Sequence, residues 1–200
     1  MNKILLYPHG GSGNHGCEAI VRSTMLLLRP EEGVLFSSAC GEDRRYGLDR
    51  TVRVLPEQRP IRRCSAGYAA AWMRRHVLGV RDAFDRLAFG GIAEEGRGAS
   101  VALCSGGDNY CYGEPVHIYL QNDLLRRAGV PAVLWGCSLE REDMKGAMLE
   151  DLKAFDLVVA RESLTCDALR ECGCSRTVLY PDPAFALPAR EAALPEGWKK

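Results

Sequence analysis

The sequence lacks an excess of either charge sign, because its 26 Lys and Arg residues are balanced by 26 Asp and Glu residues. A protein without net charge offers little nonspecific attraction to the phosphates of nucleic acids, so we expect no nucleic-acid partner. The basic stretches 59–64 and 72–76 are short, and we interpret them as solvated faces.

The sequence also lacks a long hydrophobic run. Without about eighteen consecutive apolar residues, no membrane span is predicted. The apolar residues 4–7 stop at Pro8 and are too few for a signal peptide. The nine cysteines include no C-x-x-C pair, and Cys172 and Cys174 have no matching second pair, so no metal site is predicted. We expect reduced thiols and a cytoplasmic protein.

What the sequence does contain is an alternation of short apolar runs with amphipathic segments. Strands are expected at 3–7, 33–38, 51–55, 100–105, 131–136, 156–160 and 177–180. Helices are expected at 17–28, 114–129, 141–155 and 163–172, with two more in 66–89 that cover one face of the sheet. This alternation predicts an α/β, Rossmann-like, mostly parallel sheet with helices on both faces.

We found no internal repeat and no low-complexity tract. Residues 1–188 are expected to form one Rossmann-like N-terminal domain. The stretch 189–200 is rich in Ala and Pro without a core pattern, and we interpret it as a linker or tail. A second, C-terminal domain would begin where this chain stops.

Small and polar residues follow five of the expected strands, where ligands bind in open parallel sheets. The candidate binding residues in these turns are His9, Gly11, Gly13, Asn14, His15, Gly106, Gly107, Asp108, Ser138, Arg161 and Asp182. Structural alternatives stay open for several of them. The glycine pair 106–107 can simply relieve a tight turn, Asp182 can accept backbone N–H bonds, and Arg161 can pair with Glu162 or Asp182.

The turn after the first strand, residues 9–16, contains a G-x-G-x-x-G pattern. It is not a Walker loop, because no Gly-Lys-Ser/Thr follows. A nicotinamide site would need an acid at the end of the second strand, where the nearest acids are Glu42 and Asp43, beyond a glycine. We therefore expect N–H groups at a helix N-terminus that favour an anion, although Glu18 would compete with it. Cys17 would have a lowered thiol pKa there, but we favour a buried small residue over a nucleophile.

Taken together, the turns resemble a known family. The segments GSGNHGCEAI (11–20), SGGDNYCYG (105–113), PAVLWGCSLE (131–140), VVARESLTCDALRECG (158–173) and TVLYPDPAFAL (177–187) are similar, in order and spacing, to the motifs of polysaccharide pyruvyl transferases. The resemblance spans residues 3–188. Three features depart from the pattern: Cys17 stands where many members have aspartate, the turn 136–138 is short, and the helical span 66–89 has no match.

The resemblance implies one half of a two-domain glycosyltransferase-B type fold. It also implies a donor, phosphoenolpyruvate, and an acceptor sugar of a cell-surface polysaccharide, with a pyruvate ketal as product and no cofactor or metal. In this chemistry Arg161 would grip a carboxylate or phosphate, and Asp108 would act as base or position a hydroxyl. The turn from Gly11 to Gly16 would face an anion or sugar, with His9 and His15 as possible proton donors. The chain alone would be inactive, because the missing half must supply further cations.

Three other functions remain open at this point. A nucleotide-sugar glycosyltransferase of the same architecture would hold its nucleotide in the absent half. A nicotinamide oxidoreductase is weaker, for the reason given above. A non-catalytic sugar-binding domain would explain Cys17 in place of an acid and the short third turn.

Overall fold

The computed structural model of the protein describes residues 2–189 and 196–198. Its centre is a seven-stranded sheet in which each neighbouring pair is parallel, with the order β3-β2-β1-β4-β5-β6-β7. The strands are β1 (Lys3–His9), β2 (Glu32–Ser37), β3 (Arg53–Pro56), β4 (Val101–Ser105), β5 (Ala132–Cys137), β6 (Leu157–Ala160) and β7 (Thr177–Leu179). The expected Rossmann-like fold is confirmed, and the sheet is wholly parallel.

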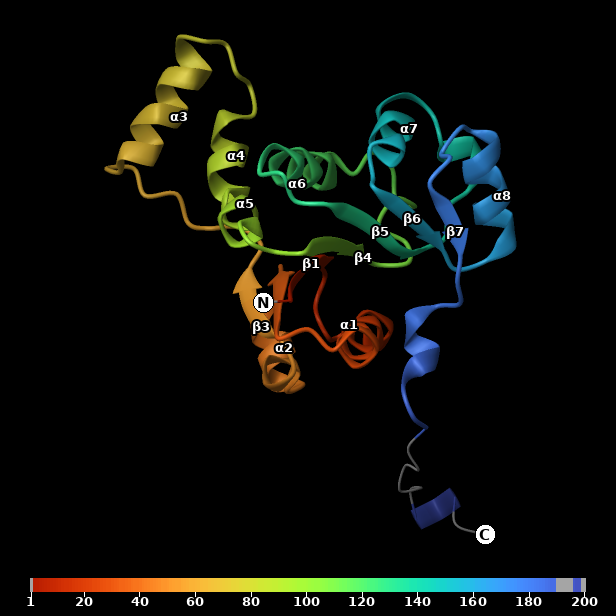
Figure 1. The fold of residues 1–200 in the computed structure, drawn as a ribbon. Coiled ribbons are helices and arrows are strands. Elements are labelled where there is room, and N and C mark those ends of the chain that lie inside the picture. Colours follow the sequence, from red (N-terminus) through yellow and green to blue (C-terminus); the bar gives the residue numbers. More distant parts are fainter. Residues whose placement is uncertain (1, 190–195, 199–200) are drawn as a thin grey trace.

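Helices cover the sheet on both faces (Figure 1). The α-helices are α1 (His15–Leu28), α2 (Cys40–Arg45), α3 (Ala66–His76), α4 (Ala83–Phe89), α5 (Gly91–Gly96), α6 (Val116–Arg127), α7 (Gly146–Lys153) and α8 (Ser163–Glu171). Short 3-10 helices are η1 (Leu48–Arg50), η2 (Arg141–Asp143), η3 (Pro183–Ala186) and η4 (Glu196–Trp198). In Figure 1, α1 and α2 lie below the sheet, and α5, α6 and α7 lie above it.

The sheet separates two apolar cores because successive strand residues point to opposite faces. In β1, Ile4 and Leu6 belong to the core shared with α1, whereas Leu5 and Tyr7 belong to the larger core on the opposite face. Strands that are buried on both faces appear in the sequence as continuous apolar runs, so the expected strand positions agree with those in the structure.

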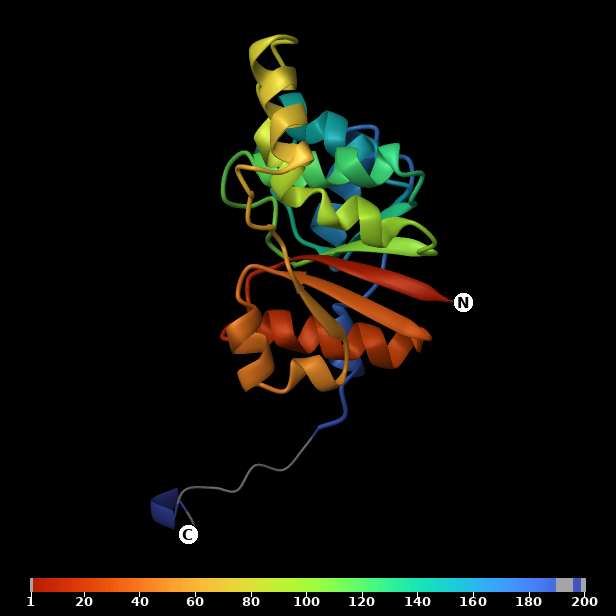
Figure 2. The ribbon, with the colours of Figure 1, turned by 90° about the vertical axis from the view of Figure 1, so that its left-hand side faces the viewer.

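The chain runs outward from β1 in two directions, and this creates a switch point between β1 and β4. Ligands bind at such a point, beyond the carboxyl ends of the strands. Figure 2 shows the strands running away from the N-terminus toward one rim, on the left of that view. The turns that carry the candidate residues lie on this rim.

Two expectations about helices need correction. The sequence predicted neither α2 nor α5, which are six residues long each. The two helices expected in 66–89 do not both cover the sheet. Although α4 places Ala88 and Phe89 against Leu120 of α6, α3 packs on α4 and projects from the domain (Figure 1).

The described residues contain no helix that is long and apolar enough to cross a membrane. Most of the expected linker or tail, 189–200, lies outside the described residues, which exclude 190–195 and 199–200.

Candidate functional site

A cavity of about 190 Å³ lies on the carboxyl rim and is formed by four separate turns. Its lining residues are Asn14, Gly16, Cys17, Ile20, Gly107, Asp108, Arg161, Asp182 and Ala184. Asn14, Gly107, Asp108, Arg161 and Asp182 are among the candidates from the sequence. The parallel sheet brings these five together although they are up to 168 positions apart along the chain.

Arg161 is held in place by two neighbouring side chains. Its Nε donates to Oγ of Ser138 at 2.7 Å, and its Nη1 donates to Oδ2 of Asp182 at 2.9 Å. The pairing with Asp182 is one of the two ion pairs that the sequence left open. Its third nitrogen, Nη2, makes no hydrogen bond to the described residues. A fixed guanidinium with a remaining donor is suited to a carboxylate or phosphate.

Gly107 makes room for this guanidinium. A Cβ at position 107 would lie 2.5 Å from Cζ of Arg161 and would overlap Nη1 as well. The glycine is therefore needed for the close approach of Arg161 to the turn after β4. The backbone also joins the two turns, because the amide of Ser138 donates to the carbonyl of Gly107 at 2.8 Å.

The two aspartates of the cavity differ in their partners. Oδ1 of Asp182 accepts the amide of Ala184 at 2.9 Å, so Asp182 caps η3 while its other oxygen binds Arg161. Oδ2 of Asp108 accepts the hydroxyl of Tyr112 at 3.0 Å. This hydrogen bond raises the pKa of Tyr112, a residue that is 84% exposed.

Cys17 is half-buried at the first turn of α1. The expectation of a lowered thiol pKa is wrong: burial raises the pKa of Cys17, and the negative charge of Asp108 raises it further. A thiol with a raised pKa is a poorer nucleophile at neutral pH, although Cys17 is half-buried and lines the cavity rather than being fully buried as we expected.

The first glycine-rich turn satisfies its own N–H groups. Oδ1 of Asn14 accepts from the amides of Gly16 and Cys17, at 3.0 and 3.4 Å. Glu42 accepts the amide of Gly13 at 3.2 Å, and Asp43 accepts the amide of Ser12 at 2.9 Å. An anion at this turn would have to displace these carboxylates, because they already accept hydrogen bonds from the backbone N–H groups that a phosphate would bind.

Glycines 11 and 13 allow α2 to approach this turn. Gly11 has φ +112°, and a Cβ there would lie 2.6 Å from both Cβ of Ala39 and Oε2 of Glu42. A Cβ on Gly13 would lie 2.8 Å from Oε2 of Glu42. Neither glycine lines the cavity of Arg161, so their spacing serves packing against α2.

The two histidine candidates lie outside the cavity. His9 is buried, with Nε2 3.0 Å from Oδ1 of Asp43. Asp43 also accepts the hydroxyl of Ser12 at 2.7 Å. Burial alone would raise the pKa of Asp43, but the hydroxyls of Ser37 and Ser12 and the adjacent His9 outweigh it and lower that pKa.

His15 is exposed and contacts its own surroundings. Its Nδ1 lies 3.3 Å from Oε2 of Glu18, and its ring meets that of Tyr46 edge-on with centroids 5.3 Å apart. Gly106, the last candidate, directly follows β4 and has φ +156°. A Cβ at this position would overlap the side chain of Asn109.

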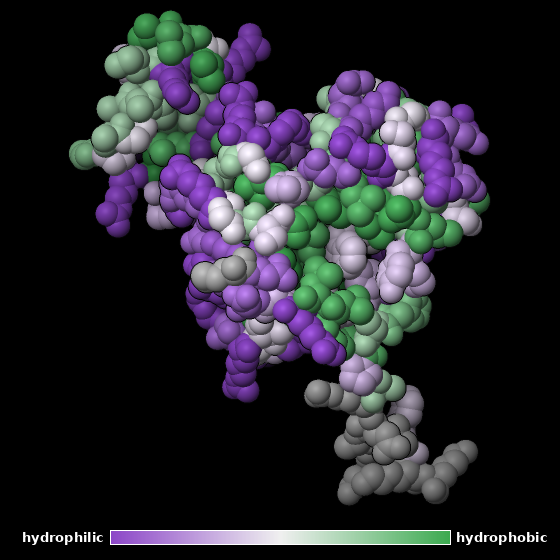
Figure 3. All heavy atoms as spheres, in the orientation of Figure 1, coloured by the Kyte–Doolittle hydropathy of each residue, from purple (hydrophilic) through white to green (hydrophobic). Residues whose placement is uncertain are grey.

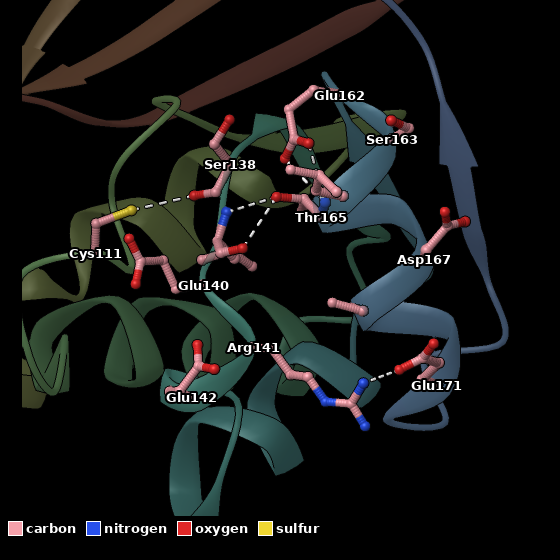
Figure 4. Close-up of a pocket in the computed structure, with 13 residues that line it drawn as sticks. Cys111, Ser138, Glu140, Arg141, Glu142, Glu162, Ser163, Thr165, Asp167 and Glu171 are labelled. Carbon is pink, nitrogen blue, oxygen red and sulfur yellow. Dashed lines mark hydrogen bonds and ion pairs between the residues drawn. The ribbon is translucent and has the colours of Figure 1, made fainter.

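A second, larger cavity of about 990 Å³ adjoins Ser138 (Figure 4). Its lining residues include Cys111, Ser138, Glu140, Glu142, Glu162, Thr165, Asp167 and Glu171. Leu139 also lines this cavity, and Thr165 holds its backbone in place. The amide of Leu139 donates to Oγ1 of Thr165 at 2.8 Å, and the carbonyl of Leu139 accepts from the same hydroxyl at 3.1 Å. The sequence did not predict this acidic cavity, because its five carboxylates are scattered over η2, α8 and the residues that precede them and form no motif.

Within the described part of the chain, no group of three or more His, Cys, Asp and Glu residues is arranged to hold a metal ion.

Comparison with solved structures places the fold among known ones. Anabaena Alr3699/HepE, solved in complex with UDP and glucose, is 14% identical with a TM-score of 0.55; the match covers 91% of this chain and 44% of that one. MurG of Acinetobacter baumannii is 11% identical with a TM-score of 0.48, covering 96% and 47%. The chain therefore spans less than half the length of these proteins. The likeness to the Anabaena structure confirms the expected similarity to half of a glycosyltransferase-B type fold.

Comparison with curated protein sequences gave no match. A sequence model of the family described as polysaccharide pyruvyl transferase, in contrast, matches residues 14–197. That range contains the whole rim cavity and all but three of the candidate residues, His9, Gly11 and Gly13. With most of its length matched, the chain belongs to the polysaccharide pyruvyl transferase family.

Proposed function

We propose that this protein transfers a pyruvyl group from phosphoenolpyruvate to a sugar of a surface polysaccharide and forms a pyruvate ketal. The observation that carries the proposal is the rim cavity in which Arg161 is fixed by Ser138 and Asp182 and keeps one nitrogen available. Membership of the family supports the same reaction class.

The donor binds in the smaller cavity. Phosphoenolpyruvate carries a carboxylate and a phosphate, and Nη2 of Arg161 donates to one of these groups. Asp182 and Ser138 fix the orientation of the guanidinium, so that less side-chain freedom is lost on binding. A second half of the protein supplies the other cations, and the 200-residue chain alone is inactive.

The acceptor sugar binds in the larger cavity. Its lining of Glu140, Glu142, Glu162 and Asp167 repels a dianion but accepts hydrogen bonds from sugar hydroxyls. Ser138 lies at the junction, because it lines the larger cavity and binds Arg161 of the smaller one. The two reactants thereby meet at the turn after β5.

The chemistry adds two hydroxyls of one sugar to one carbon of the donor. The methylene carbon of the enol gains a proton, and the central carbon, now cation-like, forms a C–O bond with the first hydroxyl. Asp108 takes the proton of that hydroxyl as general base. The C–O bond to the phosphate then breaks, and the phosphate leaves with the electrons of that bond and with the proton of the second hydroxyl. The second hydroxyl oxygen forms its own C–O bond to the central carbon, and the ketal ring closes. The proton that Asp108 took from the first hydroxyl balances the one that the methylene carbon gained.

We propose that the reaction takes place in the cytoplasm, as expected from a sequence whose nine cysteines include no C-x-x-C pair.

A ligand-observed NMR titration with phosphoenolpyruvate tests the donor assignment. It uses the full natural protein, wild type beside Arg161→Ala, with Arg176→Ala as control because Arg176 is exposed and lies at the opposite rim, before β7. We expect binding in the wild type and the control, and loss of about 2 kcal/mol or more in Arg161→Ala. Absence of binding in the wild type, or equal binding in Arg161→Ala, refutes the assignment.

One observation favours a second candidate, a nucleotide-sugar glycosyltransferase. The fold neighbour from Anabaena was solved with UDP and glucose. The same titration with UDP-glucose distinguishes the two: a protein that binds UDP-glucose but not phosphoenolpyruvate is a glycosyltransferase. If phosphoenolpyruvate binds and no sugar releases phosphate from it, the chain is a non-catalytic binding domain.

A further inference from the structure

The projecting helix α3 and its flanking loops are unlike the rest of the molecule in charge. Between Arg59 and Arg81 the sequence contains six arginines and neither Asp nor Glu, although the chain as a whole is neutral. Arg59 pairs with Glu94. The other five, Arg62, Arg63, Arg74, Arg75 and Arg81, form no ion pair with the described residues. The projection is therefore a local concentration of unneutralised positive charge.

The outward face of α3 is apolar, which is the reverse of a solvated helix. Ala71 is buried against α4, and Tyr68 packs beside Phe84 of that helix. On the opposite side the spacing 66, 70, 73, 77 brings two alanines, a methionine and a valine to one exposed stripe. The turns of α3 thus expose the residues that helices normally bury.

The far end of α3 gathers larger apolar side chains. Val77 and Leu78 are each 67% exposed, Met73 is 57% exposed and Trp72 is 48% exposed. The ring of Trp72 lies against that of His76 with centroids 4.8 Å apart. Figure 3 shows hydrophobic surface at the end of this projection, with hydrophilic side chains beside it. We call α3 with residues 59–65 and 77–81 the basic projection.

We propose that the basic projection binds the surface of an anionic lipid bilayer, with the apolar face of α3 in the headgroup region and the arginines on lipid phosphates. A helix with Trp and aliphatic residues on one face and Arg on the flanks is the type that lies in a membrane interface. Tryptophan favours that depth, and juxtaposed arginines favour anionic lipids.

Charge decides against the other occupants. A second copy of this chain docked through the same surface would bring ten unpaired arginines together, which repel one another. Nucleic acid would satisfy the arginines but would leave Met73, Val77 and Leu78 against a phosphate backbone. A bilayer satisfies both the charge and the apolar surface.

The test measures binding of the full natural protein to sedimenting vesicles. One set consists of phosphatidylcholine alone, and the other of phosphatidylcholine mixed with phosphatidylglycerol. We expect binding to the anionic vesicles, weakened by salt, and a blue shift of tryptophan emission that is lost in Trp72→Phe. Equal binding to both vesicle types, or no binding, overturns the proposal.

Paired variants separate the two components of the surface. Arg74→Gln with Arg75→Gln is expected to lower the vesicle partition coefficient by about fivefold per arginine. Arg44→Gln with Arg45→Gln, two exposed arginines on α2, is the matched control and leaves it unchanged. Equal losses in both pairs would mean that total charge, not the projection, causes binding.

The apolar component is tested by Val77→Ser with Leu78→Ser, against Val116→Ser on α6. The first pair is expected to abolish the emission shift of Trp72 and weaken binding, and the control, whose residue is 63% exposed, to do neither. Circular dichroism checks that all variants fold. A concentration-dependent dimer that the serine pair dissociates, or binding of DNA that outcompetes vesicles, would identify another occupant and overturn the proposal.

Discussion

Two glycine-rich turns lie on the same rim of the sheet, and they use glycine for different ends. In the turn after β1, Gly11 and Gly13 admit the side chains of α2, and the carboxylates of Glu42 and Asp43 occupy the backbone N–H groups. In the turn after β4, Gly107 admits the guanidinium of Arg161, which keeps a donor available. At Ser12 and Gly13 the first turn is filled by carboxylates of the protein itself, and its far end, Asn14 and Gly16, lines the cavity. The second turn lines the same cavity at Gly107, directly beside the guanidinium of Arg161.

The difference shows that a glycine pattern identifies a close approach without identifying what approaches. The pattern G-x-G-x-x-G predicts N–H groups that attract negative charge, and this physical expectation holds. The negative charge is intramolecular, however, because Glu42 and Asp43 stand where a nucleotide phosphate or a free anion would bind. Substitutions in the two turns should therefore separate stability from ligand binding.

The largest effect is expected from removing the acid that closes the first turn. Asp43→Ala would leave the amide and hydroxyl of Ser12 and the ring of His9 without their buried partner. We expect it to lower the free energy of unfolding by about 3 kcal/mol. Urea unfolding measures this loss, with the exposed Asp49→Ala as control at less than about 0.5 kcal/mol. An equal effect of the two substitutions would show that Asp43 does not hold the turn.

The next effect contrasts the glycines themselves. Gly11→Ala introduces a side chain at φ +112° against Ala39 and should cost about 2 kcal/mol of stability without weakening phosphoenolpyruvate binding to the folded protein. Gly107→Ala displaces the movable end of Arg161 and should weaken that binding about tenfold with a smaller loss of stability.

Thermal unfolding and the NMR titration, run on both variants, check this contrast. If Gly11→Ala weakens phosphoenolpyruvate binding as much as Gly107→Ala, Gly11 also supports the donor site, and the two glycines do not differ as expected.

The sheet and the convergence of the rim could be predicted from sequence because both follow from local patterns. Apolar runs locate strands that are buried on two faces, and parallel strands bring their following turns to one edge. The sequence alone thus assigns residues as distant as Asn14 and Asp182 to one rim, and both line the same cavity.

The features that could not be predicted depend on which element packs against which other element. The sequence CGEDRR of α2 has no periodic pattern of apolar residues. It therefore predicted neither a helix here nor that the acids of this helix would bind the backbone of the first turn. The span 66–89 has two helical patterns, but periodicity does not say that α3 would pack on α4 rather than on the sheet. The apolar stripe on the outward face of α3 has the spacing of a buried helix face, and periodicity alone does not show that it is exposed.

A smaller effect concerns acid stability, in which Asp43 and the partly buried Asp151 of the opposite layer should act with opposite signs. The folded-state pKa of Asp43 is lowered, so its contribution is present above its unfolded pKa of about 3.9 and is lost as pH falls through the folded value. Burial raises the pKa of Asp151 despite hydrogen bonds from Tyr110 and Asn122. The folded state then binds the extra proton, and stability falls as pH rises between the two values.

Urea unfolding at several acidic pH values separates the two. Asp43→Asn should make the loss of stability on acidification less steep, and Asp151→Asn should make it steeper. The same change of slope in both variants would contradict the assignment of opposite shifts.

The smallest effect tests whether Asp108 faces the first turn across the cavity. The pKa of Cys17 is raised by burial and then by the charge of Asp108, so Asp108→Asn should lower it and leave more thiolate at neutral pH. Alkylation of the peptide that contains Cys17, followed by mass spectrometry, should become several-fold faster, while alkylation of the exposed Cys64 stays unchanged. If phosphoenolpyruvate then slows the reaction at Cys17, donor binding reaches the wall of the cavity that α1 contributes. An unchanged rate at Cys17 in Asp108→Asn would mean that the carboxylate is turned away from α1, toward Tyr112.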